Sequence, residues 1–101
     1  MEFKLRRTLN AGKYYCAVEL SNATREDNEK AEKFGWPTLE IISQQGRKVI
    51  LSVVVLSNVA PFGFSQQDQA DNYVENLKAQ ILRIKDFWAK AKDQWSNEEV
   101  I

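Results

Sequence analysis

The chain has 101 residues and a mass of 11.7 kDa, with 14 basic and 14 acidic side chains and a formal net charge of +0. The balanced charge argues against a protein that binds polyanions irrespective of sequence, because such proteins usually carry a basic domain. One cysteine and no histidine exclude an internal disulfide and any histidine-based metal or catalytic site. The length predicts a single α+β domain, 1–96, and a frayed tail, 97–101.

No apolar run follows Met1, so the sequence predicts neither a signal peptide nor a membrane segment, and we expect a cytoplasmic protein with no membrane contact. The chain also contains no Gly-rich phosphate loop and no cysteine cluster. We therefore predict no cofactor, no metal and no catalytic residues.

The first two elements form a predicted β-hairpin. Residues 2–9 and 13–20 alternate between apolar and polar side chains, as half-buried strands do. The intervening Asn10-Ala11-Gly12 is a turn signal, because glycine readily takes a positive φ. Arg7 departs from the alternation, since it falls on the apolar side.

A helix is predicted next, over residues 25–34. Thr24 followed by Asp27 approximates a capping box, and Gly35 is placed to end the helix. Pro37 forces the residue before it out of the helical conformation, so the chain leaves the helix extended.

Two further strands are expected, at 38–43 and 49–56. The second, VILSVVVL, is apolar at nearly every position and is rich in β-branched residues. Such a run between turn signals predicts a strand buried on both faces. Each apolar face of that strand must pack against another element, and the helices can cover only one of the two faces.

The segment 57–66 is predicted to be a loop, and it contains Phe62-Gly63-Phe64. The motif has two interpretations. Both phenylalanine side chains plug the core beneath the following helix, or Phe62 and Phe64 form an exposed loop that grips a partner or lines a ligand pocket.

The last helix has the clearest pattern in the chain. Its apolar residues follow one another at steps of three and four, which places them in one stripe. The helix is longer than the predicted strands, so we expect its C-terminal turns to overhang the sheet. The stripe comprises Tyr73, Val74, Leu77, Ile81, Ile84, Trp88, Ala91 and Trp95.

The element order is ββαββα. It predicts an α+β fold with a four-stranded, largely antiparallel sheet, two helices packed on one face and a long C-terminal helix.

Strand parity leaves unusually apolar side chains on the face away from the helices, and contiguous exposed apolar patches usually mark interaction surfaces. We therefore expect a non-enzymatic binding or structural protein that forms a homodimer or higher oligomer, and binds another protein. It would associate through this outer face, a sheet edge or the overhanging helix. Alternatively, a bent strand or a loop covers the face. The predicted interface residues are Tyr15, Ile42, Ile50, Val54, Trp88 and Trp95.

Two other functions are compatible with the sequence. Basic strand residues beside an aromatic ring are used to bind single-stranded nucleic acid, through phosphate contacts and stacking. An enzyme would need a deep pocket in which Tyr15, Arg6 and Glu40 converge. The alternative nucleic-acid surface comprises Lys4, Arg6, Lys13, Tyr15, Arg47 and Lys48.

Overall fold

The computed structural model describes residues 1–96 and the side chains of residues 1–90, so the predicted tail lies outside the described residues. The fold is α+β, with antiparallel sheets and a long C-terminal helix. In chain order the elements are β1 (Glu2–Asn10), β2 (Lys13–Ser21), α1 (Arg25–Phe34), β3 (Thr38–Ile42), β4 (Lys48–Ser52), the 3-10 helix η1 (Val53–Asn58), β5 (Phe62–Phe64) and α2 (Gln67–Ser96).

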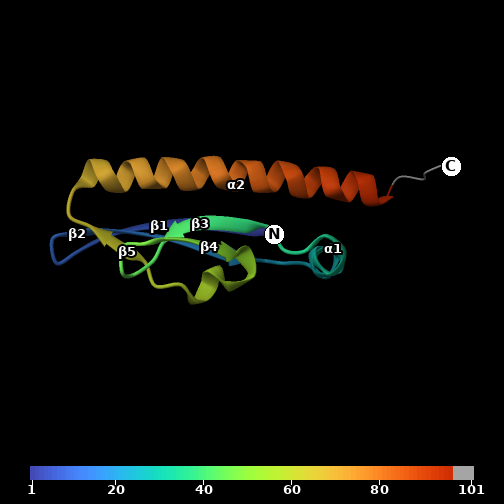
Figure 1. The fold of residues 1–101 in the computed structure, drawn as a ribbon, viewed down its shortest axis with the longest axis horizontal. Coiled ribbons are helices and arrows are strands. Elements are labelled where there is room, and N and C mark those ends of the chain that lie inside the picture. Colours follow the sequence, from blue (N-terminus) through green and yellow to red (C-terminus); the bar gives the residue numbers. More distant parts are fainter. Residues whose placement is uncertain (97–101) are drawn as a thin grey trace.

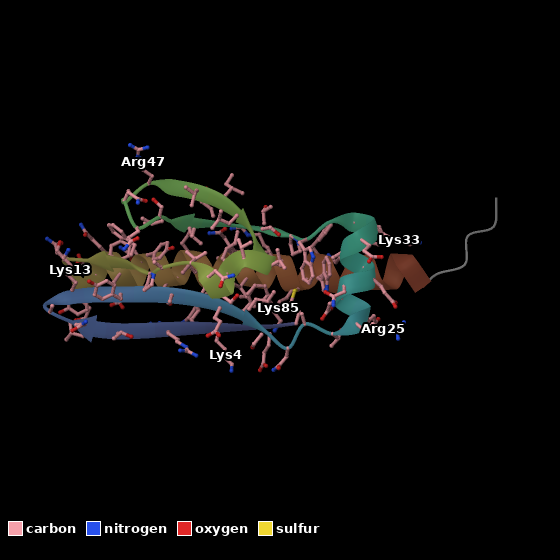
Figure 2. All side chains as sticks on the ribbon, turned by 90° about the horizontal axis from the view of Figure 1, so that it is seen from below. Lys4, Lys13, Arg25, Lys33, Arg47 and Lys85 are labelled. Carbon is pink, nitrogen blue, oxygen red and sulfur yellow. The ribbon has the colours of Figure 1, made fainter. Side chains whose placement is uncertain are left out.

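The prediction of one four-stranded sheet is wrong. The strands form two antiparallel sheets, with the orders β1-β2-β5 and β3-β4. Both sheets lie beneath α2 (Figure 1), and in the view from below β1 and β4 form the outer margins (Figure 2). The sheets remain separate because Tyr73 and Gln80 of α2 bond to the edge of β3 that would otherwise meet a strand.

The predicted hairpin is confirmed, since β1 and β2 pair along their whole length. The two turn residues, Ala11 and Gly12, have φ angles of 51° and 75°. Positive φ at both central positions is the geometry of a type I′ turn, whose twist matches that of the strands. This turn fixes the register, and the register decides which residues face α2.

Helix α1 begins and ends where the sequence predicts. The Thr24 hydroxyl accepts a hydrogen bond from the Asp27 N–H at 3.1 Å, and the Asp27 carboxylate accepts one from the Thr24 N–H at 3.0 Å, which completes the capping box. At the other end the Gly35 N–H donates to the Ala31 carbonyl at 2.8 Å. Contrary to the predicted packing, α1 crosses beneath α2 at the end of the sheets (Figures 1 and 2).

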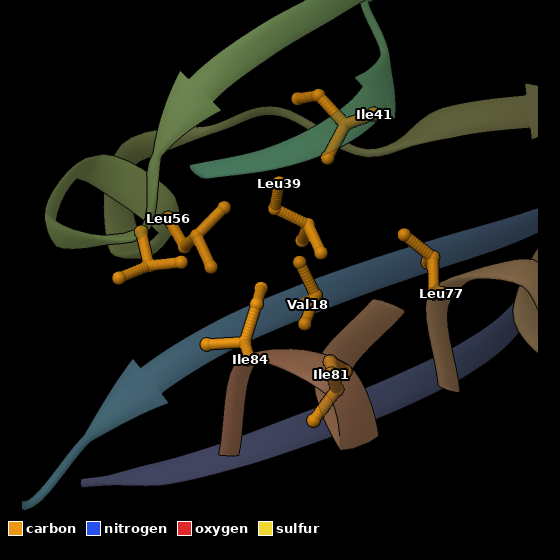
Figure 3. Close-up of a cluster of buried hydrophobic side chains, with 8 residues drawn as sticks. Val18, Leu39, Ile41, Leu56, Leu77, Ile81 and Ile84 are labelled. Atoms are coloured by element: carbon orange, nitrogen blue, oxygen red, sulfur yellow. The ribbon is translucent and has the colours of Figure 1, made fainter. Parts of the chain in front are cut away.

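Helix α2 has 30 residues, which corresponds to about 45 Å. One stripe of it faces the sheets, and the strands contribute alternate residues from below. A second, smaller cluster of Cys16, Phe64, Ala70 and Val74 lies near the start of the helix. The main cluster (Figure 3) consists of Val18, Leu39, Ile41, Val53, Leu56, Leu77, Ile81 and Ile84.

The apolar run 49–56 is not a single strand, so that prediction is wrong. β4 ends at Ser52, and the following residue, Val53, donates its N–H to the Pro37 carbonyl at 2.9 Å before the chain turns into η1. Residues three apart lie on one side of a 3-10 helix. Val53 and Leu56 therefore both point into the core, where they are 0% and 1% exposed. The bend thus brings Leu56 into the core but leaves the outer face of β4 uncovered at Ile50.

Residues 62–64, predicted to lie in a loop, form β5 and pair with β2. Phe64 is buried and Phe62 half-buried, with their rings edge to face and 5.0 Å between centroids. Between them, Gly63 lies against the Tyr15 ring, since a Cβ on Gly63 would come within 2.8 Å of it. Both phenylalanines contribute to the core, in line with the first of the two interpretations of this motif.

Candidate interaction surface

A group of aliphatic side chains stays exposed where β4 passes into η1. Ile50, at the centre of β4, is 69% exposed, and Val54 and Val55 are 48% and 39% exposed. Strand alternation turns Ile50 away from the core. The 3-10 geometry that buries Val53 and Leu56 leaves the two residues between them outside. We call Ile50, Val54 and Val55 the β4–η1 patch.

Two of the predicted interface residues, Ile50 and Val54, belong to this patch. Tyr15 and Ile42 are only half-buried, but each has a neighbour within the chain. The Tyr15 ring lies against Gly63 of the adjacent strand, and Ile42 packs against the smaller core cluster. The chain thus covers part of the face that the sequence analysis expected to be open, and the exposed apolar area is smaller than expected.

Trp88, another predicted interface residue, is a core residue of this chain. Its side chain is 5% exposed and stacks on Trp36, with centroids 5.9 Å apart and ring planes at 13°. Its indole Nε1 donates to Asp27 Oδ1 at 2.9 Å, while Lys30 Nζ donates to its backbone carbonyl at 3.0 Å and lies 4.9 Å from the ring centroid. Helix α1 therefore occupies the part of α2 around Trp88 that was expected to overhang. The side chain of Trp95 lies outside the described residues.

Asp27 is the centre of a buried polar cluster that joins α1 to α2. Its carboxylate accepts hydrogen bonds from the Met1 amino group at 3.1 Å, from the Thr24 N–H and hydroxyl at 3.0 Å each, and from Trp88 Nε1 at 2.9 Å. Burial by itself would raise the pKa of Asp27, but the hydrogen bonds outweigh burial and hold that pKa well below its usual range. The sequence marks Asp27 as a capping residue and gives no sign of the contact with Trp88. A cavity of about 310 Å³ opens beside the cluster.

A second cavity, of about 280 Å³, lies between the tip of the hairpin and the start of α2. Cys16 lines it and is buried, with its Sγ 3.8 Å from the Ala70 carbonyl oxygen. Burial raises the pKa of the Cys16 thiol; the charge of Arg7 opposes this effect and that of Asp71 adds to it. Because the thiolate is the reactive form, a raised pKa favours the inert thiol.

The three residues that an enzyme pocket would have to bring together do not converge, because Arg6 and Tyr15 lie on the β1–β2 hairpin and Glu40 lies on β3 of the other sheet. Tyr15 lines the second cavity, whereas Arg6 forms an exposed ion pair with Glu19 at 3.0 Å. The backbone of Glu40 is bonded to the side chain of Gln80 on helix α2. Within the described part of the chain, no three Cys, Asp or Glu side chains gather in a way that would hold a metal ion.

The cations of the alternative nucleic-acid surface are divided between the two sheets. Lys4, Lys13 and Arg47 project from separate parts of the surface (Figure 2). Arg6 is paired with Glu19, and the aromatic member of the set, Tyr15, packs against β5. The set lies on β1, at the start of β2 and at the β3–β4 turn: Lys4, Arg6, Lys13, Arg47 and Lys48.

Two side chains of α2 satisfy the inner edge of β3, which sequence reasoning missed. Gln80 Oε1 accepts from the Glu40 N–H at 2.8 Å, and Gln80 Nε2 donates to the Glu40 carbonyl at 3.1 Å. The Tyr73 hydroxyl accepts from the Ile42 N–H at 2.9 Å. The signal that could have found this pair is the seven-residue spacing of Tyr73 and Gln80, which puts both on one side of the helix.

No protein-family model, curated protein or solved structure matches the chain. Among the described residues, no helix has both the length and the apolarity that a membrane span requires.

Proposed function

We propose that the protein is a small, non-enzymatic binding protein that associates with a second copy of itself through the β4–η1 patch. The observation that carries this proposal is the exposure of Ile50, a branched aliphatic side chain at the centre of a strand. Val54 and Val55 extend the apolar surface from the end of the same strand. Exposed apolar side chains that are grouped in this way favour a protein-binding surface, whereas single ones are ordinary.

Two properties of the whole chain favour a second copy as the partner. The formal net charge is +0, so identical molecules meet without long-range repulsion. A domain of 101 residues also buries a smaller share of its surface than a larger one, and association offsets that deficit. We place this function in the cytoplasm, where the single cysteine remains a thiol.

The test is light scattering coupled to size exclusion, on the wild type and on the double variant Ile50→Asp, Val54→Asp. We expect a concentration-dependent dimer for the wild type and a folded monomer for the double variant, because a charge at each position must lose water when the patch is covered. The matched control is Leu82→Asp on α2. Leu82 is 67% exposed, close to the 69% of Ile50, but lies on the helix that covers the opposite face of the sheets (Figure 1).

The control should dimerise like the wild type, and circular dichroism should show that all variants are folded. If Leu82→Asp abolishes the dimer and the double variant does not, α2 carries the interface and the assignment to the patch is wrong. If the wild type stays monomeric up to about 1 mM, which corresponds to a binding free energy near −4 kcal/mol, self-association itself is refuted.

A further inference from the structure

The hydrogen bonds of β3 determine which backbone groups of β4 are free. Both backbone groups of Glu40 point to Gln80 of α2, hence away from β4. Glu40 lies opposite Ile50, so the two form a non-hydrogen-bonded pair of the β3–β4 ladder. In an antiparallel ladder the N–H and C=O of such a residue face the other edge. Ile50 therefore directs both groups outward, and by the two-residue period so do Lys48 and the N–H of Ser52. The Ser52 carbonyl accepts the first hydrogen bond of η1 instead, because Ser52 is the N-cap of that 3-10 helix.

The other described sheet edges are less suited than that of β4 to pair with an added strand. The inner edge of β3 is bonded to α2 side chains, as described above. β1 forms the opposite margin of the molecule (Figure 2) and carries the charged residues Glu2, Lys4, Arg6 and Arg7, which disfavour strand addition. β4 is charged only at its first residue and has an exposed isoleucine at its centre. β5 ends the three-stranded sheet opposite β1 but has only three residues, and very short edge strands disfavour strand addition. Among the described strands, the edge of β4 is therefore the one best suited to accept another strand.

The residue pattern of β4 is complementary to itself. A residue whose backbone N–H and C=O point away from β3 can form hydrogen bonds only with a residue of the second copy that is oriented in the same way. The antiparallel register that uses all five residues of β4 places Ile50 opposite Ile50. In that register Lys48 faces Ser52 of the second copy, so no like charges lie opposite each other. The two isoleucines meet on the face that is exposed in the single chain.

From this geometry we infer that β4 pairs antiparallel with β4 of a second copy, in the register that sets Ile50 opposite Ile50, and that the two-stranded sheets join into one of four strands. The inference rests on the proposed function, because it assigns the geometry of the same self-association. Five residues span about 17 Å, so the contact falls in the class of small interfaces, below about 1,200 Å². We therefore expect a weak dimer whose population rises with concentration.

Single cysteine substitutions test the register. Residues in a hydrogen-bonded antiparallel pair have Cα atoms about 5.5 Å apart, within the range that a disulfide bridges. Ile50→Cys should therefore form a disulfide-linked dimer under mild oxidation. Ser52→Cys is the matched control, because the two copies of residue 52 would be about 14 Å apart along the strands. The native Cys16 is buried and does not compete.

A mixture of Lys48→Cys and Ser52→Cys chains completes the test, since these residues face each other in the inferred register. We expect the disulfide in the Ile50→Cys protein and in the mixture, with at least a tenfold lower yield for Ser52→Cys alone, as measured by non-reducing electrophoresis. If the wild type dimerises in light scattering but Ser52→Cys crosslinks as well as Ile50→Cys, the register is refuted and the proposed function stands. If the wild type does not dimerise and Ile50→Cys does not crosslink, both the inferred register and the proposed self-association are refuted.

Discussion

Replacing Gly63 with alanine tests the contact that holds β5 against β2. A Cβ at this position would lie 2.8 and 2.9 Å from Cε1 and Cζ of Tyr15, and 3.2 Å from Cδ of Lys13. Carbon atoms in contact prefer separations of about 3.5 to 4.0 Å, so the overlap with the ring is at least about 0.7 Å. Gly63 is not among the described glycines with positive φ, so its backbone conformation accepts alanine. The steric overlap alone should lower the free energy of unfolding by about 1–3 kcal/mol.

The assay is urea unfolding followed by tryptophan fluorescence, in the wild type and in a Tyr15→Val background. Removing the ring removes the overlap, so Gly63→Ala should cost about 1 kcal/mol less in that background. The control is Gly12→Ala in the hairpin turn. Gly12 has φ of 75° and no atom within 4 Å of an added Cβ, so its cost of about 1–2 kcal/mol comes from the backbone and should persist without the ring. Equal costs of Gly63→Ala in both backgrounds would refute the steric explanation.

Two further changes probe the polar cluster and η1. Asp27→Asn should lower the free energy of unfolding by about 1.5–3 kcal/mol at neutral pH, because it removes the acceptor of charge-assisted hydrogen bonds. The pKa of Asp27 in the folded protein lies below its unfolded value of about 3.9, so the carboxylate stabilises the fold above about pH 4. This stabilisation is lost as the pH falls through the folded-state pKa. The free energies of unfolding of the variant and the wild type should therefore converge in acid. If the difference in free energy of unfolding between Asp27→Asn and the wild type stays constant in acid, the carboxylate is not the source of the stabilisation. Leu56→Ala should cost about 2–5 kcal/mol in urea unfolding and the neighbouring, exposed Val55→Ala less than about 0.5, whereas similar costs would show that η1 does not plug the core.

The sequence by itself determined the elements whose signals are local. Asn10-Ala11-Gly12 specifies the hairpin, because a tight turn with positive φ leaves one register for the flanking strands. The bounds of α1 follow from Thr24, Asp27 and Gly35, since capping depends on residues within one turn of the helix end. Parity also predicted that Ile50 faces away from the core, as the strand period requires.

Tertiary packing decided what local pattern could not. The run 49–56 favours a strand at nearly every residue, yet burial of Val53 and Leu56 in the core outweighs that preference and bends the chain into η1. The separation of the sheets depends on two side chains of α2 that are more than thirty residues from the strand they bond. Likewise, Trp88 is buried because α1 supplies Asp27 and Lys30, which lie 61 and 58 residues earlier in the chain. In each case the deciding contact joins distant segments, so its energy appears only once the chain has folded.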